Sequence, residues 1–127
     1  SLIFVTKSGM IKQVPGTEFD VIKRTIASTK LTEEDELVLV ELCDTMDYVV
    51  LQRHAGYFLR FLKEEVQEKK KAALGVRAMK MGDRDYLEHA YLLESRMEYQ
   101  IEYKEKQMLL NKIKLGKRDT KGTKVRV

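Results

Sequence analysis

Two histidines and one cysteine are the residues of this chain best suited to metal binding or nucleophilic catalysis. Neither His54 nor His89 has a further His or Cys nearby at the spacing of a zinc motif, so the sequence predicts no metal site. Cys43 lies between Leu42 and Asp44, without an adjacent basic residue that would lower its pKa, so we expect an ordinary thiol. A single cysteine also excludes an intrachain disulfide.

Clustered carboxylates and Gly-Lys segments are the next candidates for chemistry. Glu33–Glu36 and the pair Asp83 and Asp85 resemble acid–base sites, but each group precedes a strand-like run, where turn and solubility roles are expected. The segments Gly116–Arg118 and Lys121–Lys124 lack the spacing of a phosphate-binding Walker loop. None of these groups predicts a catalytic site.

Tyrosine is the remaining candidate nucleophile. Each tyrosine lies in a strand-like apolar run and has no adjacent Arg in a catalytic arrangement, so we expect all of them to pack between strands. They are Tyr48, Tyr57, Tyr86, Tyr91, Tyr99 and Tyr103.

The charged residues are segregated along the chain. The net charge of +4 and the pI of about 9.1 favour polyanionic partners. Residues 32–47 contain seven acidic residues and no Lys or Arg, whereas residues 112–127 contain seven basic residues against Asp119 alone. Residues 66–80 contain five basic residues against Glu68. Spaced cations without an Asn or Gln pattern predict contact with the DNA backbone that is insensitive to sequence.

Short strands account for most of the local sequence signals. Runs of β-branched, aromatic and aliphatic residues occupy Leu2–Thr6, Met10–Val14, Leu37–Leu42 and Tyr48–Leu51. The first two runs are separated at hairpin distance by Lys7-Ser8-Gly9, in which the glycine can supply a positive φ. Period-2 spacing predicts two sheets of about four strands, packed side by side. The expected core includes Ile3, Val5, Ile11, Leu37, Leu39, Val50, Phe58, Leu62, Leu87 and Leu92.

One segment departs from the strand pattern. Glu64–Leu74 consists of helix formers, with Glu four positions ahead of Lys and Gly75 as a C-cap, which favours a short helix. Its apolar face is limited to Val66, Ala73 and Leu74, so a helix there would be weakly anchored. Helix and basic loop both stay open for this segment.

The chain repeats itself. Gly9–Gln13 returns as Gly56–Arg60 after 47 residues, and Ile26–Leu31 returns as Val76–Met81 after 50. A shorter third copy begins near Tyr99. A period of about 40–50 residues with several short strands is typical of propeller blades.

The repeats divide the chain into three units. We predict one blade over residues 1–47, a second over 48–97, and a partial third with a basic end over 98–127. The fold prediction is therefore all-β, with about two and a half pinwheel or propeller-like blades of about four strands. The predicted DNA-contacting residues are Lys12, Lys23, Arg24, Lys30, Arg60, Lys69, Lys70, Lys71, Arg77, Lys80, Lys117, Arg118, Lys121, Lys124 and Arg126.

The first repeat carries a recognisable motif. Residues 4–19 run as a strand, the Lys7-Ser8-Gly9 turn, the strand Ile11-Lys12-Gln13, the Pro15-Gly16 turn and a Glu18-Phe19 corner. This pattern resembles the blade motif in the C-terminal domains of bacterial type IIA topoisomerase A subunits, namely DNA gyrase and topoisomerase IV. The second copy keeps Gly56, Arg60, Glu65 and Met79–Gly82.

The resemblance implies a β-pinwheel, a disc of blades that wraps duplex DNA around its basic rim and presents it for ATP-dependent strand passage. It implies duplex DNA and the remaining A and B subunits as partners, in the bacterial cytoplasm and at the nucleoid, with no membrane. The cleaving tyrosine belongs to another region in this family, and ATP and Mg²⁺ to other parts of the enzyme. No catalytic residue, metal or cofactor is therefore expected in this chain.

Gyrase members of the family carry a basic box of the Gln-Arg-Arg-Gly-Gly-Lys-Gly type, and no such run occurs here. The matching loop is Lys69–Gly75, which is basic but has no paired glycines. This departure favours topoisomerase IV, or a part of a gyrase domain that lacks the box.

A protein-interaction module is the alternative function. The chain starts without Met in a strand-like run, which suggests a piece of a longer protein, and a closed propeller needs at least ~4 blades. We therefore expect Leu2–Thr6 and Gln107–Leu110 to lie at open sheet edges. Such edges could pair with a partner or with a second copy as a homodimer.

Overall fold

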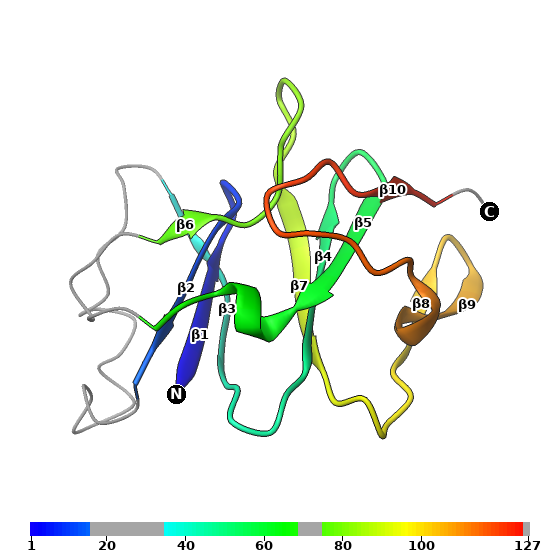
Figure 1. The fold of residues 1–127 in the computed structure, drawn as a ribbon. Helices are drawn as coiled ribbons and strands as arrows, with labels where there is room; N and C mark the ends of the chain where they lie inside the picture. The colour runs from blue at the N-terminus through cyan, green and yellow to red at the C-terminus, as the bar shows by residue number, and fades with distance from the viewer. Residues whose placement is uncertain (16–34, 69–74, 126–127) are drawn as a thin grey trace.

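The computed structural model describes residues 1–15, 35–68 and 75–125, which form short strands in three antiparallel sheets (Figure 1). Two of the sheets have four strands, as the sequence predicts, and the third has two. The first sheet contains β1 (Leu2–Thr6), β2 (Met10–Val14), β3 (Leu37–Leu42) and β6 (Val76–Arg77). The second contains β4 (Tyr48–Arg53), β5 (Tyr57–Leu62), β7 (Leu87–Leu93) and β10 (Thr123–Lys124), and the third contains β8 (Gln100–Tyr103) and β9 (Lys106–Leu109).

Each four-stranded sheet is built around a hairpin. The strand orders are β3-β1-β2-β6 and β7-β4-β5-β10, so one edge strand of each sheet, β6 or β10, comes from beyond the next hairpin in the chain. The outer strands β6 and β10 are 47 residues apart, which is also the spacing of the two hairpin glycines. Gly9 and Gly56 have φ values of +94° and +92°, a conformation that glycine adopts without steric cost. The repeat of Gly9–Gln13 at Gly56–Arg60 therefore corresponds to equivalent positions in space, while the predicted blade boundaries stay a prediction.

The largest core cluster lies between the two four-stranded sheets. Ile3 and Val5 from β1 pack there with Val49 and Leu51 from β4 and with Phe61 from β5. Seven of the ten residues predicted for the core are buried, and the other three, Leu37, Leu39 and Leu62, are half-buried.

Strand β1 departs from the predicted alternation because all five of its residues are buried. Its other face carries Leu2 and Phe4, which form a separate cluster with Val14. The expectation that Leu2–Thr6 lies at an open edge is wrong, because β1 pairs with β2 on one side and β3 on the other. At the other predicted edge, β9 covers most of Gln107–Leu110 and is paired with β8 alone among the described residues.

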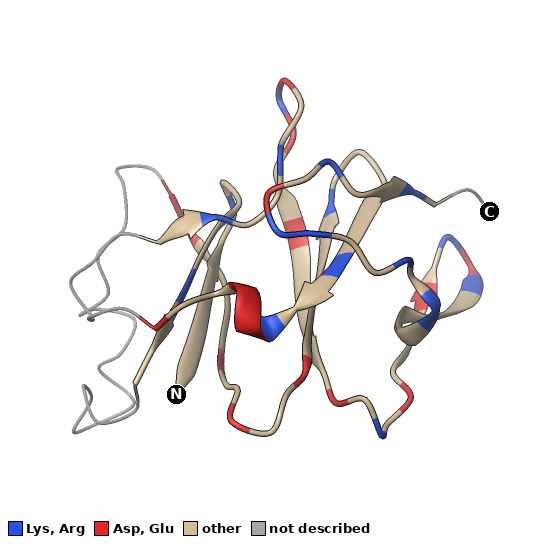
Figure 2. Ribbon diagram, viewed as in Figure 1, with Lys and Arg blue, Asp and Glu red and all other residues tan. Residues whose placement is uncertain are grey.

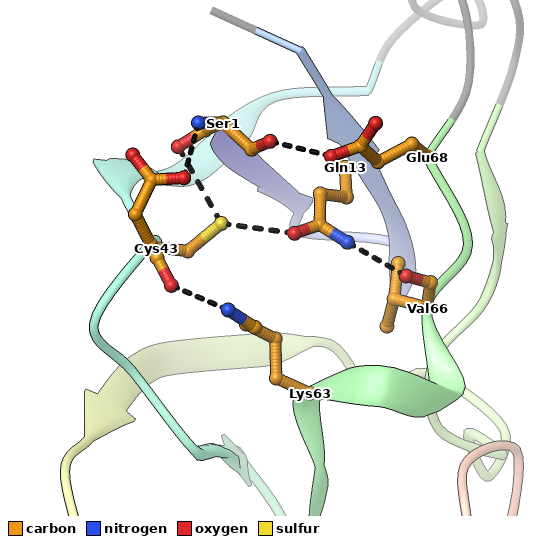
Figure 3. Close-up of polar contacts among 7 residues, drawn as sticks. Ser1, Gln13, Cys43, Lys63, Val66 and Glu68 are labelled. Carbon is orange, nitrogen blue, oxygen red and sulfur yellow. Dashed lines mark hydrogen bonds and ion pairs between the residues drawn. The ribbon is translucent and has the colours of Figure 1, made fainter.

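A polar network joins the first sheet to the end of the second hairpin (Figure 3). The buried Gln13 side chain donates from Nε2 to the Val66 carbonyl at 2.8 Å, and its Oε1 accepts from Cys43 Sγ at 3.2 Å. Lys63 Nζ donates to the Cys43 carbonyl at 2.7 Å. These bonds connect β2, the β3–β4 connection and the 3₁₀ turn η3 (Lys63–Glu65).

The same network explains why the described part of Glu64–Leu74, the segment with helical propensity, is not an α-helix. The described part of Glu64–Leu74 forms the end of η3 and then runs extended to a bridge between Glu68 and Gln13. Val66 is buried in the core, and its carbonyl is held by Gln13, so packing overrides the helical propensity here. Residues 69–74 lie outside the described residues. Within the ranges that the structure describes, no helix is long and apolar enough to span a bilayer.

Candidate nucleic-acid interface

A continuous segment crosses from the third sheet to the outer edge of the second. Residues 114–122, called the strap below, connect the 3₁₀ turn η4 (Leu110–Lys112) to β10 (Figure 1). The Gly116 amide donates to the Arg60 carbonyl at 2.7 Å, which fixes the strap beside β5. The Asp119 amide donates to the Ala78 carbonyl at 2.8 Å, so the strap also lies along the residues that follow β6.

Gly122 allows the strap to turn into β10. Its φ is +83°, and a Cβ atom at this position would lie 2.7 Å from Met79 Cε and 2.8 Å from the Phe58 carbonyl oxygen. Only glycine combines this conformation with so close an approach to the backbone of β5.

Basic residues are concentrated along the strap, the outer strands β6 and β10 and the segment that follows β6 (Figure 2). Arg77 in β6 and Lys124 in β10 lie at the outermost position of each sheet. Apart from Arg118, which is half-buried, these residues are exposed. This set, called the basic rim below, comprises Arg77, Lys80, Lys117, Arg118, Lys121 and Lys124.

The cations of the basic rim differ in how they are held. Arg77 forms an ion pair with Asp119. The hydrogen bond between them raises the pKa of Arg77 and lowers the pKa of Asp119. Arg118 donates from Nη1 to the Arg77 carbonyl at 2.6 Å. Within the described residues, no hydrogen bond or ion pair engages the ammonium groups of Lys80 and Lys117. These two charges are therefore available to an external anion.

Three cations, two of them in the basic rim, lie over the ring of Tyr57 at the start of β5. The Arg53 guanidinium lies 4.0 Å from the centre of the Tyr57 ring, and the ammonium groups of Lys121 and Lys124 lie 5.4 and 5.3 Å from it. Lys124 also donates to the Ala55 carbonyl at 2.5 Å. The aromatic face attracts each cation, which keeps like charges close together.

Two predicted residues lie outside the basic rim. Lys12 is only 4% exposed, with its ammonium group 5.5 Å from the Phe4 ring centre, and burial lowers its pKa. Arg60 is half-buried, donates from Nε to the Ile113 carbonyl at 2.8 Å and lies over the Tyr48 ring. Both side chains stabilise the fold from within. The predicted contacts outside the described residues are Lys23, Arg24, Lys30, Lys69, Lys70, Lys71 and Arg126.

A buried ion pair lies behind the rim and was not predicted from the sequence. Arg53 Nη1 lies 2.7 Å from Asp85 Oδ2, and the two side chains are only 5% and 4% exposed. Asp85 Oδ1 accepts from the amides of Ala55 and Tyr86, so its predicted turn role is confirmed. The expectation that its carboxylate lies in solvent is wrong, because the side chain is buried. An Arg that ends a strand beside an aromatic hairpin residue was the only sequence signal.

Two of the other candidate groups, Cys43 and His54, lie within the described residues and pack against neighbouring side chains. Burial raises the pKa of the Cys43 thiol more strongly than Lys63 lowers it, in agreement with an ordinary thiol. His54 stacks on Tyr86 with the ring centres 4.8 Å apart and lies 3.3 Å from a Glu88 oxygen. Among the described residues, no cluster of three or more His, Cys, Asp or Glu could hold a metal ion.

The opposite ends of the strands carry mainly negative charge. The connection between β3 and β4 contains Asp44 and Asp47, and the connection between β7 and β8 contains Glu94 and Glu98 with Arg96 (Figure 2). The molecule therefore presents an acidic end and, on the strap side, the basic rim.

Comparisons with known proteins agree with this architecture. The family model described as "DNA gyrase C-terminal domain, beta-propeller" matches residues 1–44 and 47–94. The A subunit of DNA gyrase from Klebsiella oxytoca is 34% identical over 86 residues, which cover 67% of this chain and 10% of that protein. Its counterpart from Helicobacter pylori is 32% identical over 95 residues, covering 73% and 12%. The chain thus spans about a tenth of the length of the curated relatives it matches.

Solved structures show the same fold. A crystal structure of the C-terminal domain of DNA topoisomerase IV aligns with a TM-score of 0.81 and 26% identity, over 96% of this chain and 40% of that one. A structure of the DNA gyrase A C-terminal domain aligns with a TM-score of 0.77 and 23% identity, over 95% and 41%. With its paired hairpins, its outer strands and the family match over most of its length, the chain belongs to the DNA gyrase C-terminal domain family.

Proposed function

We propose that this chain binds duplex DNA without sequence specificity and bends it along the basic rim. In this proposal it acts as part of the A protein of a type II topoisomerase, in the bacterial cytoplasm and at the nucleoid, and presents DNA for strand passage by the A and B subunits. The ATP and Mg²⁺ used in strand passage are assigned to other parts of that enzyme. The C-terminal domain family supports this assignment, and the basic rim supplies the surface.

The observation that carries the proposal is a recurrence of cations at the interval that separates the two outer strands. Basic residues recur every 47 residues in three sets. The last member of each set lies in the basic rim, on the strap or on β10, and Arg77 lies there on β6. The other members lie outside the described residues. The sets are Lys23, Lys70 and Lys117; Arg24, Lys71 and Arg118; and Lys30, Arg77 and Lys124.

A repeated cation pattern suits a repeated ligand. Cations that recur in the sequence at the blade interval would supply charge at regular steps, and a duplex carries phosphates at regular intervals along its length. The rim carries no Asn or Gln of the kind that reads adenine, and its cations are of the type that binds phosphates, so contact would be mainly with the DNA backbone. Successive blades rotated around an axis would then hold a duplex along a curved path, and bending would follow.

Salt titration tests the proposal. We expect mixed-sequence duplex DNA to bind with an association constant that falls steeply with salt, by a log–log slope of about 0.9 for each phosphate neutralised. The double variant Lys80→Ala/Lys117→Ala removes two exposed rim charges whose ammonium groups form no hydrogen bond or ion pair among the described residues, so the slope should fall by about 2. Replacing Lys69, Lys70 and Lys71 together by Ala should likewise weaken binding to every sequence alike.

The matched control is Arg96→Ala, which removes an exposed positive charge at the acidic end. Its affinity and slope should equal those of the unsubstituted chain. An association constant that does not change with salt would overturn the proposal and favour a module that binds proteins through its sheet edges.

A further inference from the structure

The buried pair of Arg53 and Asp85 lies where the second hairpin, the start of β7 and the strap meet. Arg53 Nη1 is 2.7 Å from Asp85 Oδ2, and Arg53 Nη2 donates to the Lys121 carbonyl at 3.1 Å. The guanidinium plane also packs on Tyr57, whose ring attracts the ammonium groups of Lys121 and Lys124. One side chain therefore contacts both the backbone of the strap and the ring on which two rim cations lie.

The first repeat shows which part of this arrangement belongs to the fold in general. Asp35 occupies the position of Asp85, and its Oδ1 accepts from the amides of Ser8 and Glu36 at 3.0 and 2.9 Å. Asp85 Oδ1 accepts from the equivalent amides of Ala55 and Tyr86 at 3.0 and 2.9 Å. An aspartate that joins the hairpin turn to the next strand is thus common to both repeats.

The partner of the second carboxylate oxygen differs between the repeats. In the first repeat, Asp35 Oδ2 accepts from Ser8 Oγ at 2.6 Å, and Thr6 stands at the position equivalent to Arg53. In the second repeat this oxygen binds Arg53 instead. Both positions follow a register shift in the strand pairing, between Val5 and Thr6 and between Gln52 and Arg53. The turn can therefore be held without an arginine, so what Arg53 adds is the contact with the strap.

Burial separates the role of Arg53 from that of the rim residues. Its side chain is 5% exposed, so its charge is not accessible to DNA and is compensated by Asp85. Its Nε finds no acceptor among the described residues, so the orientation of the guanidinium is set by Asp85, the Lys121 carbonyl and Tyr57.

We propose that Arg53 and Asp85 are positioning residues for DNA binding, which hold the strap so that Lys121 and Lys124 face the phosphates. This inference depends on the proposed function, because it concerns how the same rim is organised. Neither residue touches the DNA. A pre-organised pair of cations binds better than a mobile pair, because the cost of ordering the segment is already met in the free protein.

The test uses variants that leave the net charge unchanged. Arg53→Met/Asp85→Asn removes both charges, while Asn can still accept the amides of Ala55 and Tyr86. We expect this variant to be folded, to bind duplex DNA about tenfold more weakly and to lose up to about 2 from the salt slope, the share of two phosphate contacts. Arg53→Lys keeps the charge but lacks the planar fork that spans three partners, and should also bind more weakly.

A double-mutant cycle separates positioning from general damage. In a chain that already carries Lys121→Ala/Lys124→Ala, adding Arg53→Met/Asp85→Asn should cause no further loss of affinity. In a chain that carries Lys80→Ala/Lys117→Ala, the same change should still cause the full loss. Additive losses in both backgrounds would overturn the inference.

Asp35→Asn is the matched control, because this residue holds the same turn without reaching the strap. It should leave DNA affinity unchanged even if it lowers stability. If the unsubstituted chain shows no salt-dependent binding, the proposed function itself fails. If the unsubstituted chain binds DNA, and both Arg53→Lys and Arg53→Met/Asp85→Asn bind it with the same affinity as that chain, the positioning role alone fails.

Discussion

The amide of Lys80 donates to the carbonyl of Thr120 at 2.9 Å and, with the bond from the Asp119 amide to the Ala78 carbonyl, joins the segment after β6 to the segment before β10. Residues that are forty positions apart in the chain thereby become neighbours on one edge. The basic rim exists because of this junction, since its cations come from both segments. Changes that disturb the strap should therefore be felt both in the fold and at the surface.

Acid should weaken the domain partly through Asp85. Burial raises the pKa of this carboxyl, but hydrogen bonds from Arg53, Tyr86 and Ala55 outweigh that effect, so its pKa lies below the ordinary value. A carboxyl with a lower pKa in the folded state stabilises the fold above its unfolded pKa of about 3.9, and this stabilisation is lost as the pH falls through the folded pKa. Thermal unfolding between pH 7 and pH 3 should show a decline that begins near pH 4.

Asp85→Asn is the informative variant for that measurement. At pH 7 it should lower the free energy of unfolding by about 3 kcal/mol, because it leaves the Arg53 charge buried without its partner. Below pH 4 the difference from the unsubstituted chain should shrink. A constant difference across the whole range would show that the carboxyl does not titrate with folding.

Gly122→Ala should destabilise the domain. The left-handed φ alone costs on the order of 1–3 kcal/mol for a residue with a side chain, and the new Cβ would also press on the Phe58 carbonyl. Urea unfolding gives the free energy directly. Gly82→Ala is the control, because its Cβ would meet only Arg53 Nη1 at 3.6 Å, an ordinary contact; its effect should stay within about 0.5 kcal/mol.

The Cys43 thiol should react slowly in the folded protein. It is fully buried, its Sγ donates to Gln13 Oε1, and burial raises its pKa, so little thiolate is present or accessible at neutral pH. Labelling with an aromatic disulfide reagent at pH 7 should proceed only as the domain opens. The same reagent should react at once in guanidinium, and equal rates in the two conditions would contradict the described environment.

The homodimer expected from the sequence should form through the end of the molecule near β8. Met97 and Tyr99 are 62% and 43% exposed there, whereas the other predicted edge, at β1, is buried. Sedimentation at several concentrations should show association that Met97→Glu reduces. Gln100→Glu adds the same charge nearby without removing apolar surface, and should associate as the unsubstituted chain does. A strictly monomeric chain at high concentration would exclude the homodimer.

Local signals in the sequence predicted the hairpins well. The Lys7-Ser8-Gly9 turn lies between two strand-like runs, so pairing, register and the glycine conformation all follow from neighbouring residues. The 47-residue repeat between Gly9 and Gly56 then transferred this hairpin to the second sheet. Most of the core followed, because alternation within a known strand determines which residues face inward.

The outer strands and the buried pair could not be predicted in this way. β6 and β10 contain two residues each and carry Arg77 and Lys124, so they lack an apolar pattern, and their pairing is decided by contacts across more than sixty residues. Arg53 and Asp85 are 32 positions apart and form a pair only once β4 and β7 lie side by side. Basic composition identified the rim, but only tertiary structure separates Lys117 at the surface from Lys12 in the interior.

The placement of the outer strands has a consequence for how such a domain can change in length during evolution. Because β6 completes the sheet of the preceding hairpin, the unit that is repeated in the chain is not the unit that is complete in space. A duplication of one 47-residue period would supply the outer strand for the sheet before it and a new hairpin that waits for the next. The array can therefore gain or lose whole periods without damage to its interior sheets. Only the last sheet of the array then lacks an outer strand from a following period.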